Sequence, residues 1–134
     1  MIEYAEMKKD FDVWNKLKKE IDKSTTDFFV QTRQIWWCSL GVNVGSEQNG
    51  HGECFERPVI IIRKYTSDTF LCLPLTTKEK IGNYYHKLES AIETVSYVIL
   101  SQAKVLYRKR LRRLVGMVPH KEFHEIVEKY KDLI

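Results

Sequence analysis

The sequence predicts an α+β protein that is mainly β, with one helix before and one helix after five or six short strands. Two segments with apolar residues at helical spacing lie near the two ends of the chain. Between them lie short β-branched or aromatic runs separated by turn residues. Such strands form a small barrel or a strongly bent sheet, against which the second helix packs. The 134 residues suffice for about one domain.

The first helix is expected from Ile2 to about Ile21, and the segment Ser-Thr-Thr-Asp at 24–27 ends it. The residues expected on its apolar face recur at intervals of three or four: Met7, Phe11, Trp14, Leu17 and Ile21. The last helix is expected to begin at Pro119, because proline is favoured at the first helical position. Its apolar face would comprise Phe123, Ile126, Val127, Tyr130 and Leu133.

The strands are expected at 35–40, 59–65, 69–73, 84–88, 94–100 and 103–107. The β-branched run at 59–65 predicts a strand buried on both faces. A turn at Ser67-Asp68 predicts that this strand pairs with the next one in antiparallel fashion. Residues 41–56 hold four of the six glycines and are expected to form a long loop, and 74–82 a second one. Loops of more than about 12 residues in small domains are often functional.

Composition excludes several classes of protein. With 43% hydrophobic residues, three prolines and six glycines, the chain is neither disordered nor of low complexity. The longest apolar run has four residues, at 59–62, whereas a membrane-spanning helix needs about 20. The N-terminal segment is charged throughout and does not resemble a signal peptide. Three cysteines without a C-x-x-C pair predict reduced thiols, so we expect a cytoplasmic protein with no membrane partner.

The net charge of +4 is unevenly distributed along the chain. Between Gln102 and Lys121 there are seven basic residues and no acidic one, which leaves a net charge of −3 for the remainder. These basic residues are Lys104, Arg108, Lys109, Arg110, Arg112, Arg113 and Lys121. Such a segment is typical of a surface for nucleic acid or an acidic protein, although it could also be a solvated face without a specific partner.

Common catalytic and cofactor motifs are missing. His51 begins an H-x-E triplet, but the P-C-x-x-C that would complete a zinc deaminase site does not follow. His120 and His124 have the spacing of metal ligands but lack the glutamate of H-E-x-x-H. No phosphate-binding glycine motif or G-x-S-x-G elbow occurs. We therefore expect no metal and no cofactor, and we expect Cys38 and Cys72, in apolar strands, to be unreactive.

A possible reactive set does follow from the predicted strand pairing. If 59–65 and 69–73 are antiparallel, Arg57 before the first strand and Thr76 after the second meet at one end of the sheet. The loop that carries Glu47 can fold over the same edge. A carboxylate, a guanidinium and a hydroxyl together suit phosphoryl chemistry. Alternatively, Arg57 pairs with Glu53 or Glu56, and the threonines serve only as turn residues.

Five motifs in a fixed order resemble those of the MazF/PemK family of bacterial toxins, which are endoribonucleases of type II toxin–antitoxin pairs. The motifs are Ile35-Trp36-Trp37, Gly45-Ser46-Glu47-Gln48, Arg57-Pro58-Val59-Ile60-Ile61, Leu73-Pro74-Leu75-Thr76-Thr77-Lys78 and Ile99-Leu100-Ser101-Gln102. The resemblance covers about Gln34 to Leu133. It implies an SH3-like barrel (the CcdB/MazF-like toxin barrel) with added helices, a homodimer, and metal-independent cleavage of single-stranded mRNA. We accordingly divide the chain into a helical extension, 1–31, and a toxin domain, 32–134.

The resemblance also implies roles for individual residues. Arg57 and Thr76 match the catalytic arginine and threonine, and Glu47 matches a glutamate implicated in some members. The implied RNA-binding residues are Ser46, Gln48, Thr77, Lys78, Gln102, Lys104, Arg108 and Arg110. Cleavage would leave a 2′,3′-cyclic phosphate and a 5′-OH. Arg57 would stabilise the charge on phosphorus or also donate a proton, Thr76 would bind the phosphate, and Glu47 would act as base or order its loop. The matched motifs contain no histidine, which argues against a paired-histidine mechanism.

Two departures from the family pattern bear on these expectations. The stretch 49–56 is longer than the usual link and adds two acidic residues near the phosphate site, and the first helix lies outside the common core. That helix would pack on the barrel or serve the dimer. Family antitoxins carry an acidic C-terminal segment, which Lys104 and the arginines of 108–113 could bind instead of RNA. The rival functions are a non-catalytic module that binds nucleic acid or protein, and a toxin that poisons DNA gyrase. Tyr84, Tyr85 and the outward-facing one of Trp36 and Trp37 are candidates for base stacking.

Overall fold

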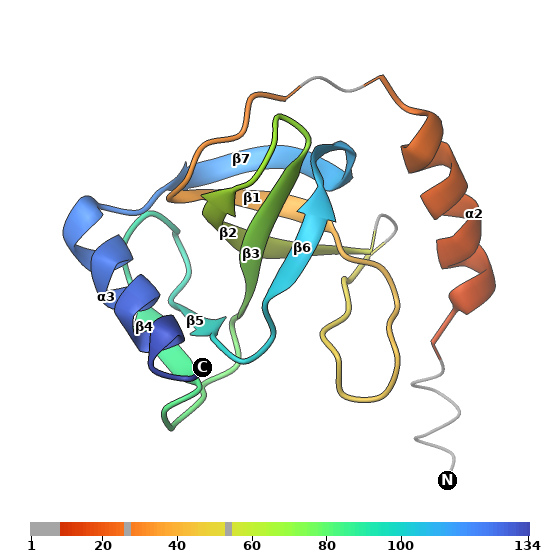
Figure 1. The fold of residues 1–134 in the computed structure, drawn as a ribbon. Coiled ribbons are helices and arrows are strands. Elements are labelled where there is room, and N and C mark those ends of the chain that lie inside the picture. Colours follow the sequence, from red (N-terminus) through yellow and green to blue (C-terminus); the bar gives the residue numbers. More distant parts are fainter. Residues whose placement is uncertain (1–8, 26–27, 53–54) are drawn as a thin grey trace, which may run out of the picture.

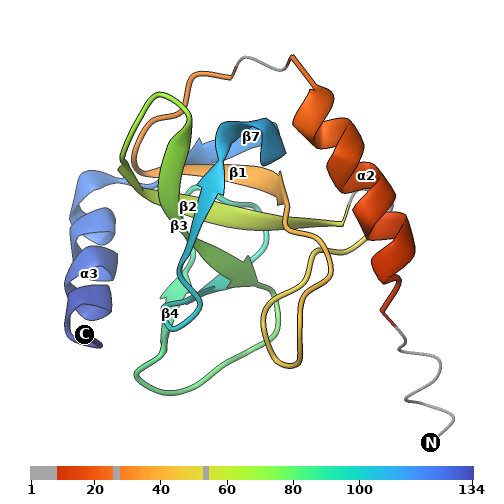
Figure 2. The ribbon, with the colours of Figure 1, turned by 45° about the vertical axis from the view of Figure 1, so that its right-hand side comes forward.

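The computed structural model describes residues 9–25, 28–52 and 55–134. Within these ranges, seven strands form one strongly bent antiparallel sheet, and helices α2 (Phe11–Lys23) and α3 (His120–Lys131) lie on opposite sides of it (Figures 1 and 2). This arrangement confirms the predicted α+β class, mainly β, with a helix before and after the strands. Neither helix of the described part is long and apolar enough to cross a bilayer.

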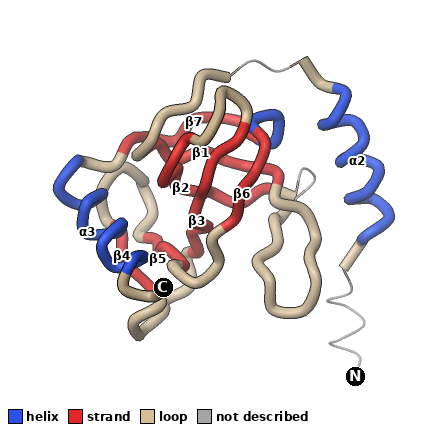
Figure 3. The backbone as a smooth tube through the Cα atoms, in the orientation of Figure 1, coloured by secondary structure: helices blue, strands red, loops and turns tan. Residues whose placement is uncertain are grey.

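The sheet is organised around its third strand (Figure 3). The strands are β1 (Gln34–Ser39), β2 (Glu56–Lys64), β3 (Thr69–Thr76), β4 (Tyr85–Leu88), β5 (Ser96–Ile99), β6 (Lys104–Tyr107) and β7 (Leu111–Met117). Their order is β4-β5-β3-β2-β1-β7, and β6 also pairs with β3. The first half of β3 bonds to β6 and its last residues bond to β5, so the sheet divides there and bends.

Strand β7 was not predicted. It lies at the end of the strand order and pairs with β1 through a ladder that contains two register shifts. Because of these irregularities, apolar and polar residues do not alternate along it, and Arg112, Arg113 and Leu114 are all exposed. The expected loop at 41–56 is confirmed with a shift of one residue, since β1 ends at Ser39 and β2 begins at Glu56. The expected loop at 74–82 begins later than predicted, because β3 continues to Thr76.

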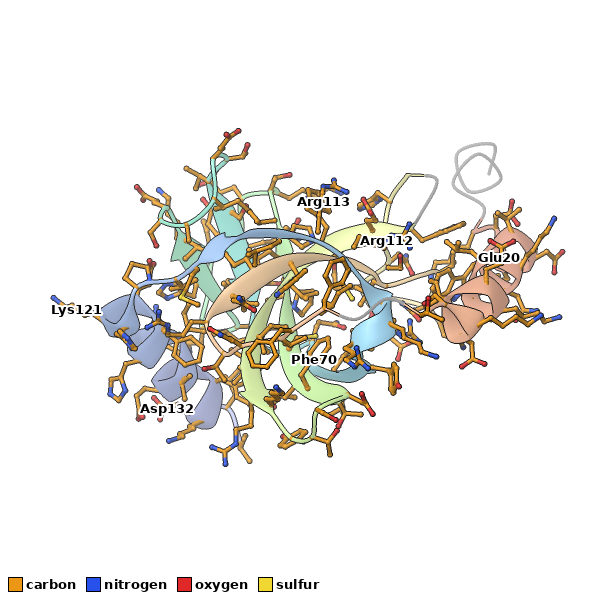
Figure 4. All side chains as sticks on the ribbon, turned by 90° about the horizontal axis from the view of Figure 1, so that it is seen from above. Glu20, Phe70, Arg112, Arg113, Lys121 and Asp132 are labelled. Carbon is orange, nitrogen blue, oxygen red and sulfur yellow. The ribbon has the colours of Figure 1, made fainter. Side chains whose placement is uncertain are left out.

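The two faces of β2 belong to two different parts of the core. Ile60 and Ile62 face α3 and pack in a cluster with Ile126 of that helix. Val59 and Ile61 face the opposite side and pack in a second cluster with Phe70, which lies amid the strands in Figure 4. The prediction of a strand buried on both faces is therefore correct. The predicted apolar face of α3 is also confirmed: Phe123, Val127, Tyr130 and Leu133 pack around Ile126.

Helix α2 covers the base of the loop that joins β1 to β2. It begins at Phe11, where the side chain of Asp10 accepts a hydrogen bond from the backbone N–H of Val13. The expected start at Ile2, and Met7 with it, lies outside the described residues. Trp14 and Ile21 are buried against Val42, whereas Phe11, expected on the same face, is 49% exposed. The contact face is therefore shorter than the periodicity suggested, because the helix packs on a narrow loop and not on the sheet.

Candidate active site

A cleft of about 650 Å³ lies where β2 begins and β3 ends. The antiparallel register of these strands places Val59 opposite Pro74. Arg57, two residues before Val59, and Thr76, two residues after Pro74, consequently reach the same end of the sheet, and both line the cleft. The loop after β1 closes over this end and adds Glu47 to the lining. The structure thus brings together the three residues that the sequence proposed as a reactive set.

Arg57 is the most enclosed charged group of the cleft, with 8% of its surface exposed. Its Nε donates to the carbonyl of Asn49 at 2.6 Å, and Nη1 donates to the carbonyl of Leu75 at 3.0 Å. Nη2 lies 2.9 Å from Nε2 of His51. Burial lowers the pKa of Arg57. Of the five N–H groups of a guanidinium, these contacts among described residues leave one each on Nη1 and Nη2 for an anion.

The loop between β1 and β2 is held in shape by its own hydrogen bonds. The Asn49 side chain accepts from the backbone N–H of Asn43 at 2.6 Å, and the Asn43 side chain donates to the carbonyl of Gln48 at 2.7 Å. The loop folds so tightly that a β-carbon on Gly50 would lie 1.5 Å from the carbonyl oxygen of Phe55. Glycine is therefore required at position 50, and the closed loop presents the Asn49 carbonyl to Arg57.

Arg57 does not form the ion pair with Glu56 that the sequence left open. Glu56 instead pairs with Arg113 at 3.1 Å and Arg112 at 3.7 Å on β7. Figure 4 shows both arginines projecting from β7 near the beginning of β2. Glu53, the other alternative partner, lies outside the described residues. The charge of Glu56 is thus compensated across the sheet by β7 and not by Arg57.

Thr76 is half-buried at the end of β3. Its hydroxyl oxygen accepts a hydrogen bond from the backbone N–H of Lys78 at 3.2 Å, so the hydroxyl proton remains available to a ligand. Thr77 and Lys78 follow it into the cleft lining and are exposed. A hydroxyl donor and an ammonium group therefore lie in the cleft where β3 ends.

Glu47 lines the cleft but forms no hydrogen bond or ion pair with Arg57 or Thr76. One of its carboxylate oxygens accepts from the backbone N–H of Val44 at 3.0 Å and closes a turn within the loop. Its negative charge also acts on Lys104. The pKa of Lys104 is lowered, mainly by burial, and the charge of Glu47 offsets part of this decrease. This geometry suits the loop-ordering role expected for Glu47 more directly than the role of base.

The residues expected to bind RNA divide into two groups. Ser46, Gln48, Thr77 and Lys78 line the cleft. Gln102 lies beside it, with its side-chain amide 3.5 Å from the Ser46 carbonyl, and Lys104 is half-buried on β6. Arg108 and Arg110 do not line the cleft: Arg108 pairs with Asp68 at 2.7 Å, and Arg110 donates to the Ser39 carbonyl at 3.3 Å. Neither arginine lines the cleft, although Arg110 lies close enough to Lys104 to contribute to lowering its pKa.

The basic segment 102–121 does not form one arm in space. Its residues are distributed over β6, the 3₁₀ turn η1 (Arg108–Arg110), β7 and α3. Lys109 donates to the Asp22 carbonyl of α2 at 2.8 Å, whereas Arg113 pairs with Glu56 across the sheet. The basic side chains of this segment are therefore spread over several elements, because strands and turns point neighbouring side chains in different directions.

Two aromatic residues are now assigned. Trp36 is buried and donates its indole N–H to the side chain of Gln34 at 3.0 Å. Trp37 points the other way, lines the cleft, and lies beneath the guanidinium of Arg113 at 4.8 Å. A neighbouring hollow of about 540 Å³ shares Trp37 and Thr77 with the cleft. The two hollows therefore adjoin at these shared residues, where the Arg113 guanidinium lies over the Trp37 ring.

Sequence reasoning missed the contribution of His51. Its backbone forms a reciprocal pair of hydrogen bonds with Glu56, at 2.7 and 2.8 Å, which places its imidazole beside Arg57. Burial, Arg57 and Lys78 lower the pKa of His51. The printed sequence contained no signal for this contact, because it depends on how the 41–55 loop turns.

The other candidates considered for metal or thiol chemistry do not form a site. Among the residues that the structure describes, no group of three His, Cys, Asp or Glu side chains could hold a metal ion, and His120 and His124 are exposed on α3. Cys38 and Cys72 are buried free thiols. Burial raises the pKa of Cys38 to about 12 and raises that of Cys72 well above its ordinary value, as expected of unreactive cysteines. Cys54 lies outside the described residues.

Comparison with known proteins assigns the fold to a family. A family model described as a PemK-like, MazF-like toxin of type II toxin–antitoxin systems matches residues 31–134. The chain is similar to a crystal structure of MazF from Deinococcus radiodurans, with a TM-score of 0.65, 18% identity, and coverage of 80% of this chain and 97% of that one. No curated protein sequence matches the chain.

Two mycobacterial structures show the same fold. A structure described as an endoribonuclease in complex with its cognate antitoxin, from a mycobacterial species, matches with a TM-score of 0.61 and 16% identity, covering 77% of this chain and 92% of that one. The Mycobacterium tuberculosis toxin MazF-mt6 matches with a TM-score of 0.58 and 15% identity, covering 75% and 94%.

Proposed function

The chain belongs to the family of PemK-like, MazF-like toxins of type II toxin–antitoxin systems, and we propose on this premise that it is an endoribonuclease that cleaves single-stranded mRNA. The observation that carries the proposal is the convergence of Arg57 and Thr76 in one cleft. Similar solved structures are described as endoribonucleases, and the residues that match the family's catalytic pair lie at the same end of the sheet here.

The reaction proposed is an intramolecular transesterification. The ribose 2′-oxygen attacks the adjacent phosphorus, the bond from phosphorus to the 5′-oxygen breaks, and the products carry a 2′,3′-cyclic phosphate and a 5′-OH. Because the nucleophile belongs to the substrate, the protein has to position the phosphate, stabilise its added charge and move two protons. These requirements need no metal ion.

Arg57 and Thr76 suit the stabilising part of this task. The two N–H groups left on Arg57 Nη1 and Nη2 can donate to phosphate oxygens, and charge-assisted bonds of this kind are stronger than neutral ones. The Thr76 hydroxyl can donate to a further oxygen. Arg57 is held by Asn49 and Leu75 before a substrate arrives, so little reorganisation is needed during the reaction.

The two adjoining hollows support binding of a single strand. Trp37 offers a face on which a base can stack, and Lys78, Lys80 and Arg113 supply cations along the lining. Ser46, Gln48 and Thr77 add polar groups that can meet base edges or sugars. An unpaired strand is favoured because its bases can be turned out onto such a surface.

The experiment that tests the proposal is incubation of the purified chain with a long single-stranded RNA in EDTA, followed by mapping of the new ends. Cleavage at short recurring sequences, with 5′-OH and cyclic phosphate ends, is the expected result. Bound but intact RNA would assign the chain to a non-catalytic binding module. Intact RNA together with inhibition of DNA gyrase would assign it to the gyrase poisons.

We further propose that the chain acts in the cytoplasm as a homodimer and is neutralised by a cognate antitoxin with an acidic segment. A similar structure from Deinococcus radiodurans is a complex of MazE with MazF. The extension 1–31 and the toxin domain 32–134 would form the two parts of each subunit. Co-expression with a short neighbouring reading frame that encodes an acidic-tailed protein should restore growth and yield a co-purifying complex.

A further inference from the structure

His51 presents an unprotonated ring nitrogen to the phosphate-binding end of the cleft. Its Nε2 lies 2.9 Å from Nη2 of Arg57. A guanidinium can donate hydrogen bonds but cannot accept them, so Nε2 has to be the acceptor and the ring proton has to lie on Nδ1. A neutral imidazole in this tautomer has the lone pair of a general base.

We propose that His51 is the general base that removes the proton from the ribose 2′-OH. The proposal rests on the proposed ribonuclease function. It assigns the role of general base, for which the motif residues Arg57, Thr76 and Glu47 are less suitable. The proposal is based on the position of Nε2 beside Arg57. The 2′-oxygen is on the ribose carbon adjacent to the one that bears the scissile phosphate, so a phosphate bound by Arg57 brings the 2′-OH close to Nε2.

The other groups of the cleft are less suitable as the base. Arg57 remains protonated, and a threonine hydroxyl has no basic lone pair at neutral pH. The Glu47 carboxylate is engaged by the Val44 backbone N–H, and its charge acts on Lys104. Histidine is in addition the residue whose ordinary pKa lies closest to neutral pH, which favours proton transfer.

The backbone around His51 holds the ring in place without enclosing it. The two hydrogen bonds between His51 and Glu56, at 2.7 and 2.8 Å, fix its backbone to the beginning of β2, one residue before Arg57. The side chain itself is exposed to the cleft and lines it. When a phosphate oxygen replaces Nε2 as acceptor for the Arg57 N–H, the lone pair becomes available to the neighbouring 2′-OH.

The 2′-O–H bond breaks and its proton is transferred to Nε2 of His51, which becomes imidazolium. The 2′-oxygen forms a bond to phosphorus, and the bond from phosphorus to the 5′-oxygen breaks with its electron pair left on that oxygen. The 5′-oxygen takes a proton from solvent water, and the imidazolium returns its proton to solvent.

The charges around His51 keep it in the basic form. Burial, Arg57 and Lys78, in that order, lower its pKa from the ordinary 6.5. The charged groups that line the cleft with it are Arg57 and Glu56 on β2, Glu47 in its own loop, Lys78 and Lys80 after β3, and Arg113 on β7. Glu56 is paired with Arg113 and so does not offset the two cations that act on His51. The cleavage rate should therefore rise with pH through a pKa below 6.5 and be independent of His51 protonation above it.

The test is single-turnover RNA cleavage between pH 5 and 8 by the wild-type chain, His51→Gln, His51→Ala and, as a matched control, His120→Gln on the exposed face of α3. Glutamine can still accept from Arg57, so the loop should remain folded. We expect His51→Gln to lose about 10²-fold or more in rate, together with the acid limb of the pH profile, while binding of a 2′-deoxy analogue is kept. Added imidazole should partly restore cleavage by His51→Ala.

Two variants and the wild-type chain together distinguish an error in the assignment of His51 from an error in the proposed ribonuclease function. Cleavage by His51→Gln within threefold of the wild type, or an unchanged acid limb, would overturn the assignment of His51 and leave the proposed function intact. Lys78→Gln should move the acid limb towards 6.5, since one of the cations that lower the His51 pKa is removed. A wild-type chain that cuts no RNA at any pH would overturn both proposals.

Discussion

The indole ring of Trp14 lies directly against Gly41. A β-carbon added to Gly41, whose φ is +84°, would lie 2.1 Å from the ring. Gly41 begins the loop that carries Glu47 and His51, and the Phe55 ring at the other end of this loop lies 5.5 Å from Trp14. The helix outside the family core therefore holds both ends of the loop that covers the cleft.

Trp14→Ala is expected to lower the free energy of unfolding by about 3 kcal/mol, because it removes the largest side chain of a buried cluster and leaves a cavity. Urea denaturation measures this change. Val13→Ala on the same helix is the control: Val13 is 51% exposed, so its loss should cost less than about 0.5 kcal/mol. Equal stability of the two variants would show that α2 does not anchor the loop. RNA cleavage by Trp14→Ala should slow as the loop loosens.

Arg57→Lys is expected to reduce RNA cleavage by about 10²-fold or more, because lysine keeps the charge but loses the planar fork of donors. Single-turnover cleavage measures the loss, and circular dichroism checks that the variant is folded. Arg63→Lys, on an exposed position of the same strand, is the control and should cleave at the wild-type rate. A fully active Arg57→Lys would remove Arg57 from the proposed site.

Thr76 can be tested through its hydroxyl alone. Thr76→Val preserves the shape but removes the donor, and we expect a loss of about tenfold or more in cleavage. Thr76→Ser keeps the hydroxyl and should remain within a few-fold of the wild type. If the valine and serine variants cleave RNA at the same rate, Thr76 has a structural role at the end of β3 and does not bind the phosphate.

Glu56→Gln should strengthen RNA binding. The change frees Arg113 from a 3.1 Å ion pair and removes one negative charge from the cleft lining. We expect about fivefold tighter binding of a 2′-deoxy analogue at low salt, on the order of 1 kcal/mol for a partly screened charge, fading as salt rises. Fluorescence anisotropy at several salt concentrations measures it. Glu20→Gln on the exposed face of α2 should leave binding unchanged, and equal affinities for both variants would contradict the prediction.

Stability should fall at alkaline pH in part through Cys38. Burial raises its folded-state pKa from 9.0 to about 12. Since the folded pKa is the higher one, this contribution is complete below pH 9, where both states hold the proton. It decreases as pH rises towards 12, where the unfolded chain loses the proton more readily. In urea denaturation at pH 7 to 11, the free energy of unfolding of wild type should fall more steeply above pH 9 than that of Cys38→Ala. Parallel curves would contradict the predicted burial.

The parts of the fold that could be predicted are those whose pattern is local. The α3 face around Ile126 follows from periodicity, because packing against a single neighbour imposes a regular spacing. The doubly buried strand β2 follows from its continuous run of β-branched residues, which suits burial on both faces. Strand β7 could not be predicted in this way. Its pairing with β1 is interrupted by register shifts, and Arg112 and Arg113 mask its strand character.

The sequence by itself determined the class of fold, the family motifs and the meeting of Arg57 with Thr76, since antiparallel pairing of adjacent strands places these residues at one end of the sheet. The tertiary structure decided which side chains contact Arg57 and its chain neighbour Glu56. Glu56 adjoins Arg57 in the chain but pairs with Arg113, whereas His51, six residues away, meets the guanidinium. Successive strand residues point to opposite faces, and the turn of a loop is set by contacts made far along the chain, here with α2. The neighbours of the reactive set therefore depend on packing that the linear order does not contain.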